Sequence, residues 1–222
     1  MTSPALKLRV IRNSKASNAR ATDPGADNLT QRIADIFRVS RTLVRQALMQ
    51  LSRDRLITLE PARGARVAEP GIEEAKQVFE TRNMLEAAMI RRAATEFTDA
   101  QIGELRAHLR AESLALQRTD VSGRTRLLAD FHVVIAQMLG NQVLARLLGD
   151  LVSRCALIAL MYQSAHSAEH SAAEHVAIVD ALARRDARAA VKLMERHLHN
   201  VERNLRLDPH ATDLAAALQP AN

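Results

Sequence analysis

The segment that decides the fold is residues 33–70, IADIFRVSRTLVRQALMQLSRDRLITLEPARGARVAEP. One apolar pattern with helical spacing ends before Ser40 and a second follows it, and Ser is a preferred residue at the N-terminal cap of a helix. Two short extended segments, 56–59 and 65–68, come next and are separated by a turn rich in Pro and Gly. Two helices joined by a tight turn and followed by a two-stranded hairpin predict a winged helix-turn-helix.

Each of the two expected helices has one apolar face. The first helix, 29–38, places Ile33, Ile36 and Phe37 on one side. The second begins after the Ser cap, and its apolar face consists of Leu43, Val44, Ala47, Leu48 and Leu51. We expect these faces to form the core of a small domain over residues 28–69.

The first turns of the second helix carry polar and basic side chains. Arg41, Thr42 and Arg45 lie there, at the end of a recognition helix that enters the major groove of DNA, where Arg binds guanine or phosphate. Arg63 and Arg66 lie on the expected wing, near the DNA backbone or the minor groove. A solvated basic helix face is the alternative interpretation of the same residues.

Basic charge is concentrated in the N-terminal third of the chain. Residues 1–70 hold 13 Lys and Arg against 6 Asp and Glu, whereas residues 71–222 hold 18 against 19. A basic domain on a nearly neutral body predicts a polyanionic partner such as double-stranded DNA. A basic tail without structure would give the same asymmetry.

The composition argues against several classes of protein. No run of about 18 apolar residues occurs, so we expect no membrane-spanning segment. The basic N-terminus has no apolar stretch of the kind found in secretory signals, and the single Cys155 has no partner for an intrachain disulfide. These features predict a protein of the reducing cytoplasm.

Residues 72–206 show helical patterns throughout. Without strand-like alternation, we expect a bundle of six helices, at 72–95, 98–118, 122–139, 141–163, 171–184 and 186–206. Thr98 and Ser171 each open a segment with capping-box spacing, and Asp186 is a suitable cap for the last helix. The body is therefore predicted to be all helical.

The remaining segments define the expected boundaries. Glu69–Gly71 breaks the pattern between the two domains. Residues 1–27 lack periodicity and are rich in polar residues, so we expect a mobile or degenerate N-terminal segment, and 207–222 is expected to be a frayed tail. The predicted fold class is mainly α, with a winged helix-turn-helix at 28–69 and a helical domain at 72–206.

Three histidines lie on apolar faces of three different expected helices: His132, His175 and His197. A lone core histidine is usually a hydrogen-bonded structural residue, and that alternative stays open for each ring. Three inward imidazoles from different helices are, however, a typical binding set for a divalent transition metal. His166 and His170, before the fifth helix of the body, are secondary candidates.

Arg82 shares an apolar helix face with Val78, Leu85 and Met89. A guanidinium in such a position requires an anion. Two anions are open: the carboxylate of a small effector, and an acidic side chain of a neighbouring helix.

The segment 33–70 resembles the winged helix of the GntR family of bacterial transcription regulators. The matching positions are Ile33-Ala34, Val39-Ser40-Arg41-Thr42, Val44-Arg45, Ala47-Leu48, Leu51 and Arg63-Gly64-Ala65. The resemblance implies that the DNA-binding residues are Arg38, Ser40, Arg41, Thr42, Arg45, Arg63 and Gly64. Arg38 and Arg55 stand where the family usually has glycine, so a left-handed backbone is expected at both.

The first helix of that family, which packs behind the motif, has no convincing counterpart in residues 5–27. Only Asp23-Pro24-Gly25 resembles the turn that usually follows it. The resemblance therefore implies a winged helix that lacks its first helix, with weak or dimer-dependent DNA binding.

Residues 72–206 resemble the FCD domain, the helical effector-binding domain of FadR-like GntR regulators. The markers are Glu80–Glu86, Phe131-His132, Gly140-Asn141, Glu174-His175 and Met194–Leu198. That domain holds a divalent transition metal, zinc- or nickel-like, through an Asp and three histidines that correspond to His132, His175 and His197. Leu128 occupies the Asp position, and Asp130 lies about 200° around the helix from His132. Water or an effector oxygen would then complete the site; weak or absent metal binding is the alternative.

A body of six helices resembles the VanR-like subgroup, and effectors in the family are small organic acids, sugar acids or amino-acid derivatives. We therefore expect a homodimeric, effector-responsive repressor, not an enzyme, that binds an operator and a small carboxylate held by Arg82. Two alternatives remain: a histidine-metal hydrolase, and a ligand-binding dimerisation module with an impaired DNA-binding domain.

Overall fold

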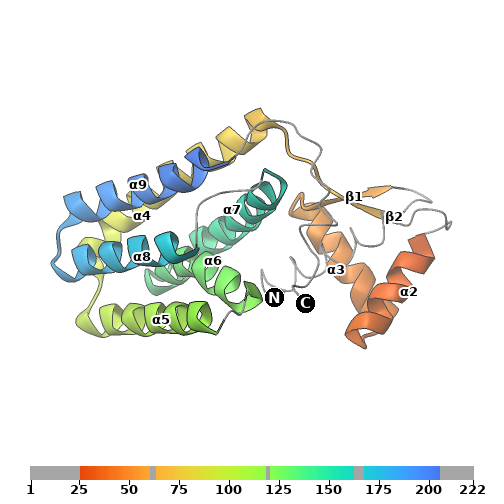
Figure 1. Ribbon diagram of the computed structural model, residues 1–222, viewed down its shortest axis with the longest axis horizontal. Helices are drawn as coiled ribbons and strands as arrows, with labels where there is room; N and C mark the ends of the chain where they lie inside the picture. The colour runs from red at the N-terminus through yellow and green to blue at the C-terminus, as the bar shows by residue number, and fades with distance from the viewer. Residues whose placement is uncertain (1–25, 61–63, 119–120, 163–167, 206–222) are drawn as a thin grey trace. The chain divides into compact units, whose positions relative to one another are not determined.

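The computed structural model describes residues 26–60, 64–118, 121–162 and 168–205 (Figure 1). The chain divides into two compact units between Pro70 and Gly71. In the described part of the chain, no helix combines the length and apolar character that a membrane crossing requires. Most of the expected N-terminal segment and all of the expected tail lie outside the described residues.

The N-terminal unit is a winged helix-turn-helix. Its elements are α2 (Ala26–Phe37), α3 (Arg41–Arg53), β1 (Ile57–Glu60) and β2 (Gly64–Val67). The strands pair antiparallel, with Ile57 opposite Val67 and Glu60 opposite Gly64, and this hairpin is the wing. The predicted order of elements is confirmed; α2 begins earlier than expected, and each strand is displaced by one residue.

Helices α2 and α3 supply most of the core of this unit. The buried side chains on the two helices include Ile33, Ala34, Val44, Leu48 and Leu51. Ser40 caps α3 as predicted, because its hydroxyl oxygen accepts the N–H of Leu43 at 3.2 Å. The cap fixes where the second helix begins.

Two predicted core positions are wrong: Ile36 is 56% exposed and Leu43 is 52% exposed. Each helix buries one face, which runs through Ile33 on α2 and through Val44 and Leu48 on α3. Ile36 and Leu43 lie beside these faces. The expected faces were too wide because the sequence pattern counted every apolar side chain near them.

Three helices are followed, within two residues, by an arginine in the left-handed conformation. Arg38, Arg55 and Arg185 have φ angles of 53°, 57° and 59°. The next N–H then returns to a carbonyl five residues back, as in Leu56 to Leu51 at 2.9 Å. This is the Schellman motif, in which glycine is the usual residue. The expectation of a left-handed backbone at Arg38 and Arg55 is therefore confirmed.

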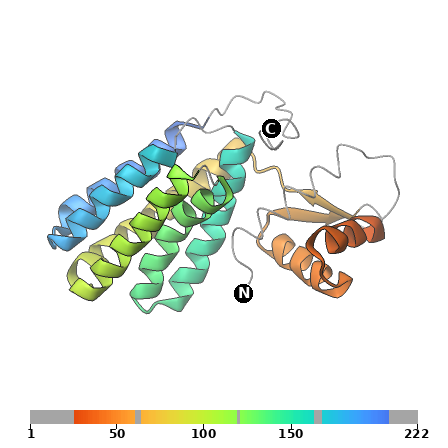
Figure 2. The same cartoon turned by 60° about the horizontal axis from the view of Figure 1, so that its bottom comes forward.

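The second unit contains six helices in its described residues. They are α4 (Ile72–Glu96), α5 (Asp99–Gln117), α6 (Val121–Met138), α7 (Gln142–Met161), α8 (Ala168–Ala183) and α9 (Ala187–Arg203). Helix α4 packs on α9, and α8 contacts both α5 and α9 (Figure 1). Helix α6 packs on α7 (Figure 2). The core is apolar, and its fully buried members include Phe131, Ile135, Ile178, Leu182 and Met194.

Two of the three predicted caps in this unit are confirmed. Thr98 opens α5 with a capping box, and Asp186 caps α9. Ser171 does not cap a helix, because α8 already begins at Ala168. Glu174, which was expected to complete that capping box, instead contacts a histidine of α9.

Arg55→Gly is expected to stabilise the N-terminal unit by roughly 0.5–1 kcal/mol. A left-handed backbone costs an L residue roughly 1–2 kcal/mol, and part of the gain is offset because glycine raises the conformational entropy of the unfolded chain. Hydrogen exchange of the α3 amides measures the change. Arg53→Gly, at the last residue of α3, is the matched control and should destabilise the unit, because Arg53 keeps a helical backbone. Faster exchange in Arg55→Gly than in the unchanged protein would contradict the argument.

Candidate functional site

The N-terminal end of α3 carries the side chains that were predicted to contact DNA. Arg41, Thr42 and Arg45 are all exposed. Arg38 is exposed in the turn before this helix, whereas the hydroxyl oxygen of Ser40 is engaged as the helix cap. Two basic side chains and one hydroxyl group are thus presented together on the first turns of α3.

The wing adds one further exposed cation. Arg66 lies on β2, where its guanidinium is 3.9 Å from the carboxylate of Glu69. Gly64 begins the same strand opposite Glu60. Arg63 lies outside the described residues, so its predicted contact with DNA stays a prediction.

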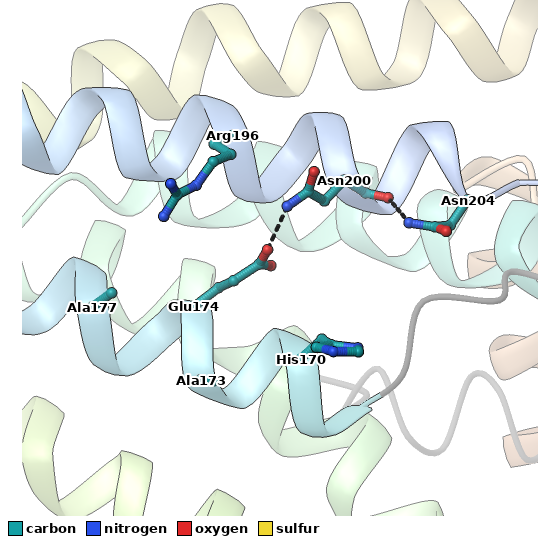
Figure 3. A pocket seen from close by; sticks show the side chains of 7 residues that line it. All are labelled: His170, Ala173, Glu174, Ala177, Arg196, Asn200 and Asn204. Atoms are coloured by element: carbon teal, nitrogen blue, oxygen red, sulfur yellow. Dashed lines mark hydrogen bonds between the residues drawn. The ribbon is translucent and has the colours of Figure 1, made fainter.

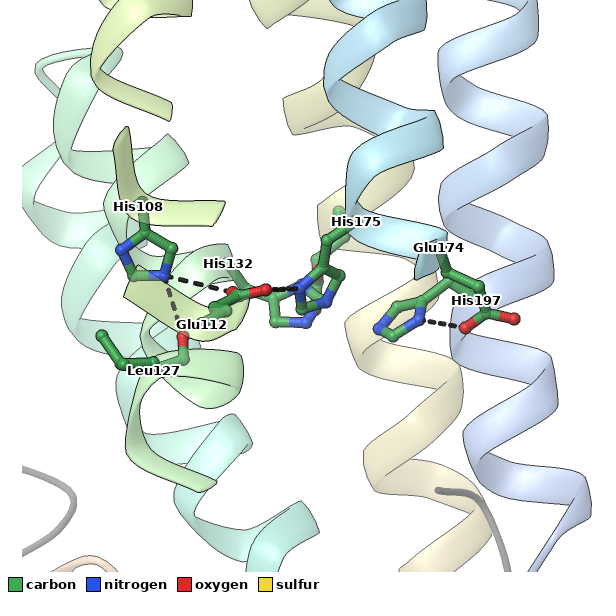
Figure 4. Close-up of polar contacts among 8 residues, drawn as sticks. His108, Glu112, Leu127, His132, Glu174, His175 and His197 are labelled. Atoms are coloured by element: carbon green, nitrogen blue, oxygen red, sulfur yellow. Dashed lines mark hydrogen bonds and ion pairs between the residues drawn. The ribbon is translucent and has the colours of Figure 1, made fainter. Parts of the chain in front are cut away.

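The three predicted histidines meet inside the second unit. His132 lies on α6, His175 on α8 and His197 on α9, and each residue is at most 3% exposed. One nitrogen from each ring lies within 4.8 Å of the other two. Figure 4 shows the rings converging from their separate helices. Among the described residues, this is a group that could hold a metal ion.

Each of these rings bonds through Nδ1 to a glutamate carboxylate. The distances are 2.5 Å for His132 to Glu86, 3.1 Å for His175 to each oxygen of Glu112, and 2.7 Å for His197 to Glu174. An ionised carboxylate can only accept, so each Nδ1 carries the proton and donates it. Nε2 is then the ring nitrogen that remains for a metal. The buried Nε2 of His175 has no hydrogen-bond partner.

The three imidazoles are held in their neutral form. Burial lowers the pKa of His132 and of His197 to about 4, although Glu86 and Glu174 act in the opposite direction. Burial also lowers the pKa of His175. Neutral imidazole is the form that coordinates a metal, so these rings could act as ligands at neutral pH.

Arg82 is buried beside the cluster. Its Nε donates to Glu86 at 2.7 Å, one turn further along α4. Burial opposes the ionisation of Glu86, but the charge of Arg82 and the contact with His132 outweigh it and lower the pKa of that carboxyl to about 2. The anion beside Arg82 thus comes from its own helix, a possibility that the sequence analysis did not consider. Nη2 of Arg82 is buried without a hydrogen-bond partner.

Glu112 has a second partner in His108. Nε2 of His108 lies 3.3 Å from a Glu112 oxygen and donates to the carbonyl of Leu127 at 2.9 Å. The Phe131 ring stacks on His175 with centroids 3.9 Å apart. These contacts tie α5 and α6 to the ring that α8 contributes.

The other candidate ligands do not join the group. Leu128 is half-buried and offers no ligand atom, and Asp130 is half-buried with a pKa raised by burial. Neither residue is among the three that meet. His170 is exposed at the start of α8, and His166 lies outside the described residues. The poor placement expected for Asp130 agrees with this arrangement.

A groove of about 510 Å³ runs between α8 and α9 (Figure 3). Its lining consists of His170, Ala173, Glu174, Ala177, Arg196, Asn200 and Asn204. Glu174 accepts a hydrogen bond from Asn200 at 2.6 Å with one oxygen and from His197 with the other. This carboxylate therefore connects the wall of the groove to the histidine cluster.

The sequence did not predict the contacts of Glu86, Glu112 and Glu174 with the histidines. Glu86 had a usable signal, because it stands four residues after Arg82 on the same helix. Glu174 has the spacing of a capping box that begins at Ser171, and that interpretation is wrong. Glu112 had no local signal, because its partner His175 is far away in the sequence and becomes a neighbour only through packing.

Glu86→Ala is expected to destabilise the second unit by about 3–5 kcal/mol, because it leaves the charge of Arg82 buried and unpaired. Urea unfolding followed by circular dichroism measures the loss. Glu96→Ala is the matched control on α4, since the Arg92–Glu96 pair is about half exposed, and we expect no measurable change. Equal unfolding midpoints for the two variants would contradict this account of the ion pair.

Comparison with known proteins agrees with the fold. A family model described as the FCD domain matches residues 77–200. The chain is 26% identical over 184 residues to the HTH-type transcriptional repressor RspR of Escherichia coli K12, covering 82% of this chain and 81% of that protein. It is 30% identical over 188 residues to the HTH-type transcriptional repressor NanR of Escherichia coli K12 DH10B, covering 74% and 70%.

Solved structures show the same fold. Escherichia coli McbR/YncC matches with a TM-score of 0.68 at 21% identity, covering 90% of this chain and 95% of that one. Streptococcus agalactiae GntR matches with a TM-score of 0.51 at 20% identity, covering 78% and 87%. With the FCD match and the winged helix, these findings establish that the chain belongs to the GntR family of DNA-binding transcription regulators, in the branch that carries an FCD domain.

Proposed function

We propose that this regulator is a homodimeric repressor whose helical unit binds a divalent transition metal and a small carboxylate effector. The observation that carries the proposal is the cluster of His132, His175 and His197. Each ring is buried and neutral, and each has its Nδ1 bonded to a carboxylate. This is the arrangement that metal-binding histidines adopt in proteins.

The donor set fits a metal. The unpartnered Nε2 of His175 is a buried polar atom that a metal ion would satisfy. Three imidazole nitrogens suit zinc- or nickel-like ions better than calcium or magnesium, which prefer oxygen ligands. A metal bound by these three rings would supply a Lewis-acidic position for an oxygen ligand.

A small carboxylate is the proposed effector because Arg82 has a buried donor to offer. Its Nη2 lacks a hydrogen-bond partner, and its charge is close enough to lower the pKa of His132 and His197. Guanidinium groups bind carboxylates in preference to neutral ligands. An effector that binds two arrangements of the protein with different affinity changes DNA binding, and DNA changes effector binding by the same factor.

The proposed DNA contacts lie on α3 and the wing. Arg41, Thr42 and Arg45 would contact base edges and phosphates in the major groove. Arg38, Ser40, Arg63 and Gly64 complete the proposed contact set, with main-chain or phosphate contacts. Two copies of this unit would address the two halves of a pseudo-palindromic operator.

Catalysis is not part of the proposal. Hydrolysis at a metal of this kind requires a general base, and the carboxylates beside the rings are each bonded to a ring nitrogen. The similar proteins RspR and NanR are named as transcriptional repressors.

In a thermal-shift screen, small carboxylic acids are expected to raise the melting temperature of the protein loaded with Zn²⁺ or Ni²⁺. His175→Ala should lose the bound metal and this response together, because it removes one of three ligands. His199→Ala, exposed on α9, is the control and should behave like the unchanged protein. Equal metal content in His175→Ala and His199→Ala after reconstitution would reject the metal site.

Arg45→Ala is expected to weaken DNA binding more than tenfold and to reduce its salt dependence, because a cation on the first turns of α3 is lost. The probe is a duplex selected by the unchanged protein from a random-sequence library, and a gel shift measures binding. Arg110→Ala, an exposed arginine on α5, is the control and should bind as before, and both variants should keep the same oligomeric state. Undiminished binding by Arg45→Ala would remove α3 as the recognition helix.

A further inference from the structure

We infer that Glu86, Glu112 and Glu174 are positioning residues that fix the three imidazoles with Nε2 available to a metal and set how tightly a divalent ion binds. This inference rests on the metal site of the proposed function. The three glutamates would contact the metal ligands and not the metal ion itself.

The contacts are arranged so that every ring is held between two helices. Glu86 of α4 holds His132 of α6, Glu112 of α5 holds His175 of α8, and Glu174 of α8 holds His197 of α9. A ring bonded across a helix interface cannot rotate about χ2 without losing its carboxylate. Figure 4 shows two of these contacts, between Glu112 and His175 and between Glu174 and His197. The three rings are therefore oriented by packed helices before any ion arrives.

Each carboxylate is itself held by a further side chain. The partners are Arg82 for Glu86 at 2.7 Å, His108 for Glu112 at 3.3 Å and Asn200 for Glu174 at 2.6 Å. Three chains of contacts, each of three residues, thus end at the histidine cluster. A carboxylate fixed in this way transmits its position to the ring and increases the basicity of Nε2.

The charges around the rings also favour a bound cation. Three carboxylates surround the rings, and the positive groups beside them are the buried guanidinium of Arg82 and the imidazole of His108, which contacts Glu112; an excess of buried negative charge is unfavourable. A divalent cation would compensate this excess, although no carboxylate coordinates it. The side chain of Glu112 is 1% exposed and that of Glu174 is 18% exposed, so the charge of Glu112 is less screened by water.

The test uses Gln variants, which keep the shape and an acceptor oxygen while removing the charge. In the full-length protein, Glu112→Gln is expected to raise the Kd for Zn²⁺ by about 10- to 100-fold, and Glu174→Gln by a smaller factor. Glu104→Gln, exposed on α5, is the matched control and should leave the Kd unchanged. The visible absorption of bound Co²⁺ reports the ligand geometry and should change in the first two variants only.

The possible outcomes distinguish a failure of the positioning role from a failure of the metal site. Wild-type Kd values and Co²⁺ spectra in both Glu112→Gln and Glu174→Gln would overturn the positioning role while leaving the metal site intact. Failure of the unchanged protein to bind Zn²⁺ or Co²⁺ would remove the metal site and the inference with it. Circular dichroism checks that each variant folds, and Glu174→Gln, at the more exposed position, serves if Glu112→Gln does not fold.

Discussion

The stability of the helical unit depends on how its buried charges are paired. Arg82 and Glu86 are almost inaccessible to water, and removing an isolated ion from water costs several kcal/mol even after the protein relaxes. The cost falls when the two charges lie close together and the carboxylate makes a further hydrogen bond. Glu86 meets this condition by bonding both Arg82 and His132, which fixes α4 against α6. The placement of His132 in the histidine cluster follows from this arrangement.

Periodicity located the metal-binding candidates because position on a helix is a local property. His132, His175 and His197 each have apolar neighbours at helical spacing in the sequence. The fold brings the three rings together. Their carboxylate partners could not be found in this way. A glutamate on a helix looks the same in sequence whether it faces water or an imidazole of another helix, as Glu112 shows.

The N-terminal unit shows the same division between local and tertiary information. The Ser40 cap and the left-handed Arg38 and Arg55 could be predicted because they are properties of the chain over a few residues. The exposure of Ile36 and Leu43 could not, since it depends on which partner covers each helix. Arg63 and the segment before α2 lie outside the described residues, so those expectations stay predictions.

The glutamate–histidine pairs that cross from helix to helix have a consequence for assembly. An apolar core tolerates the sliding of one helix past another, because one Leu or Ile contact replaces a similar one. A carboxylate that must reach an imidazole does not, since a shift of one turn, about 5.4 Å, leaves both groups buried and unsatisfied. Misaligned bundles of this chain are thereby penalised, and the polar centre favours the helix alignment in which each glutamate meets its imidazole.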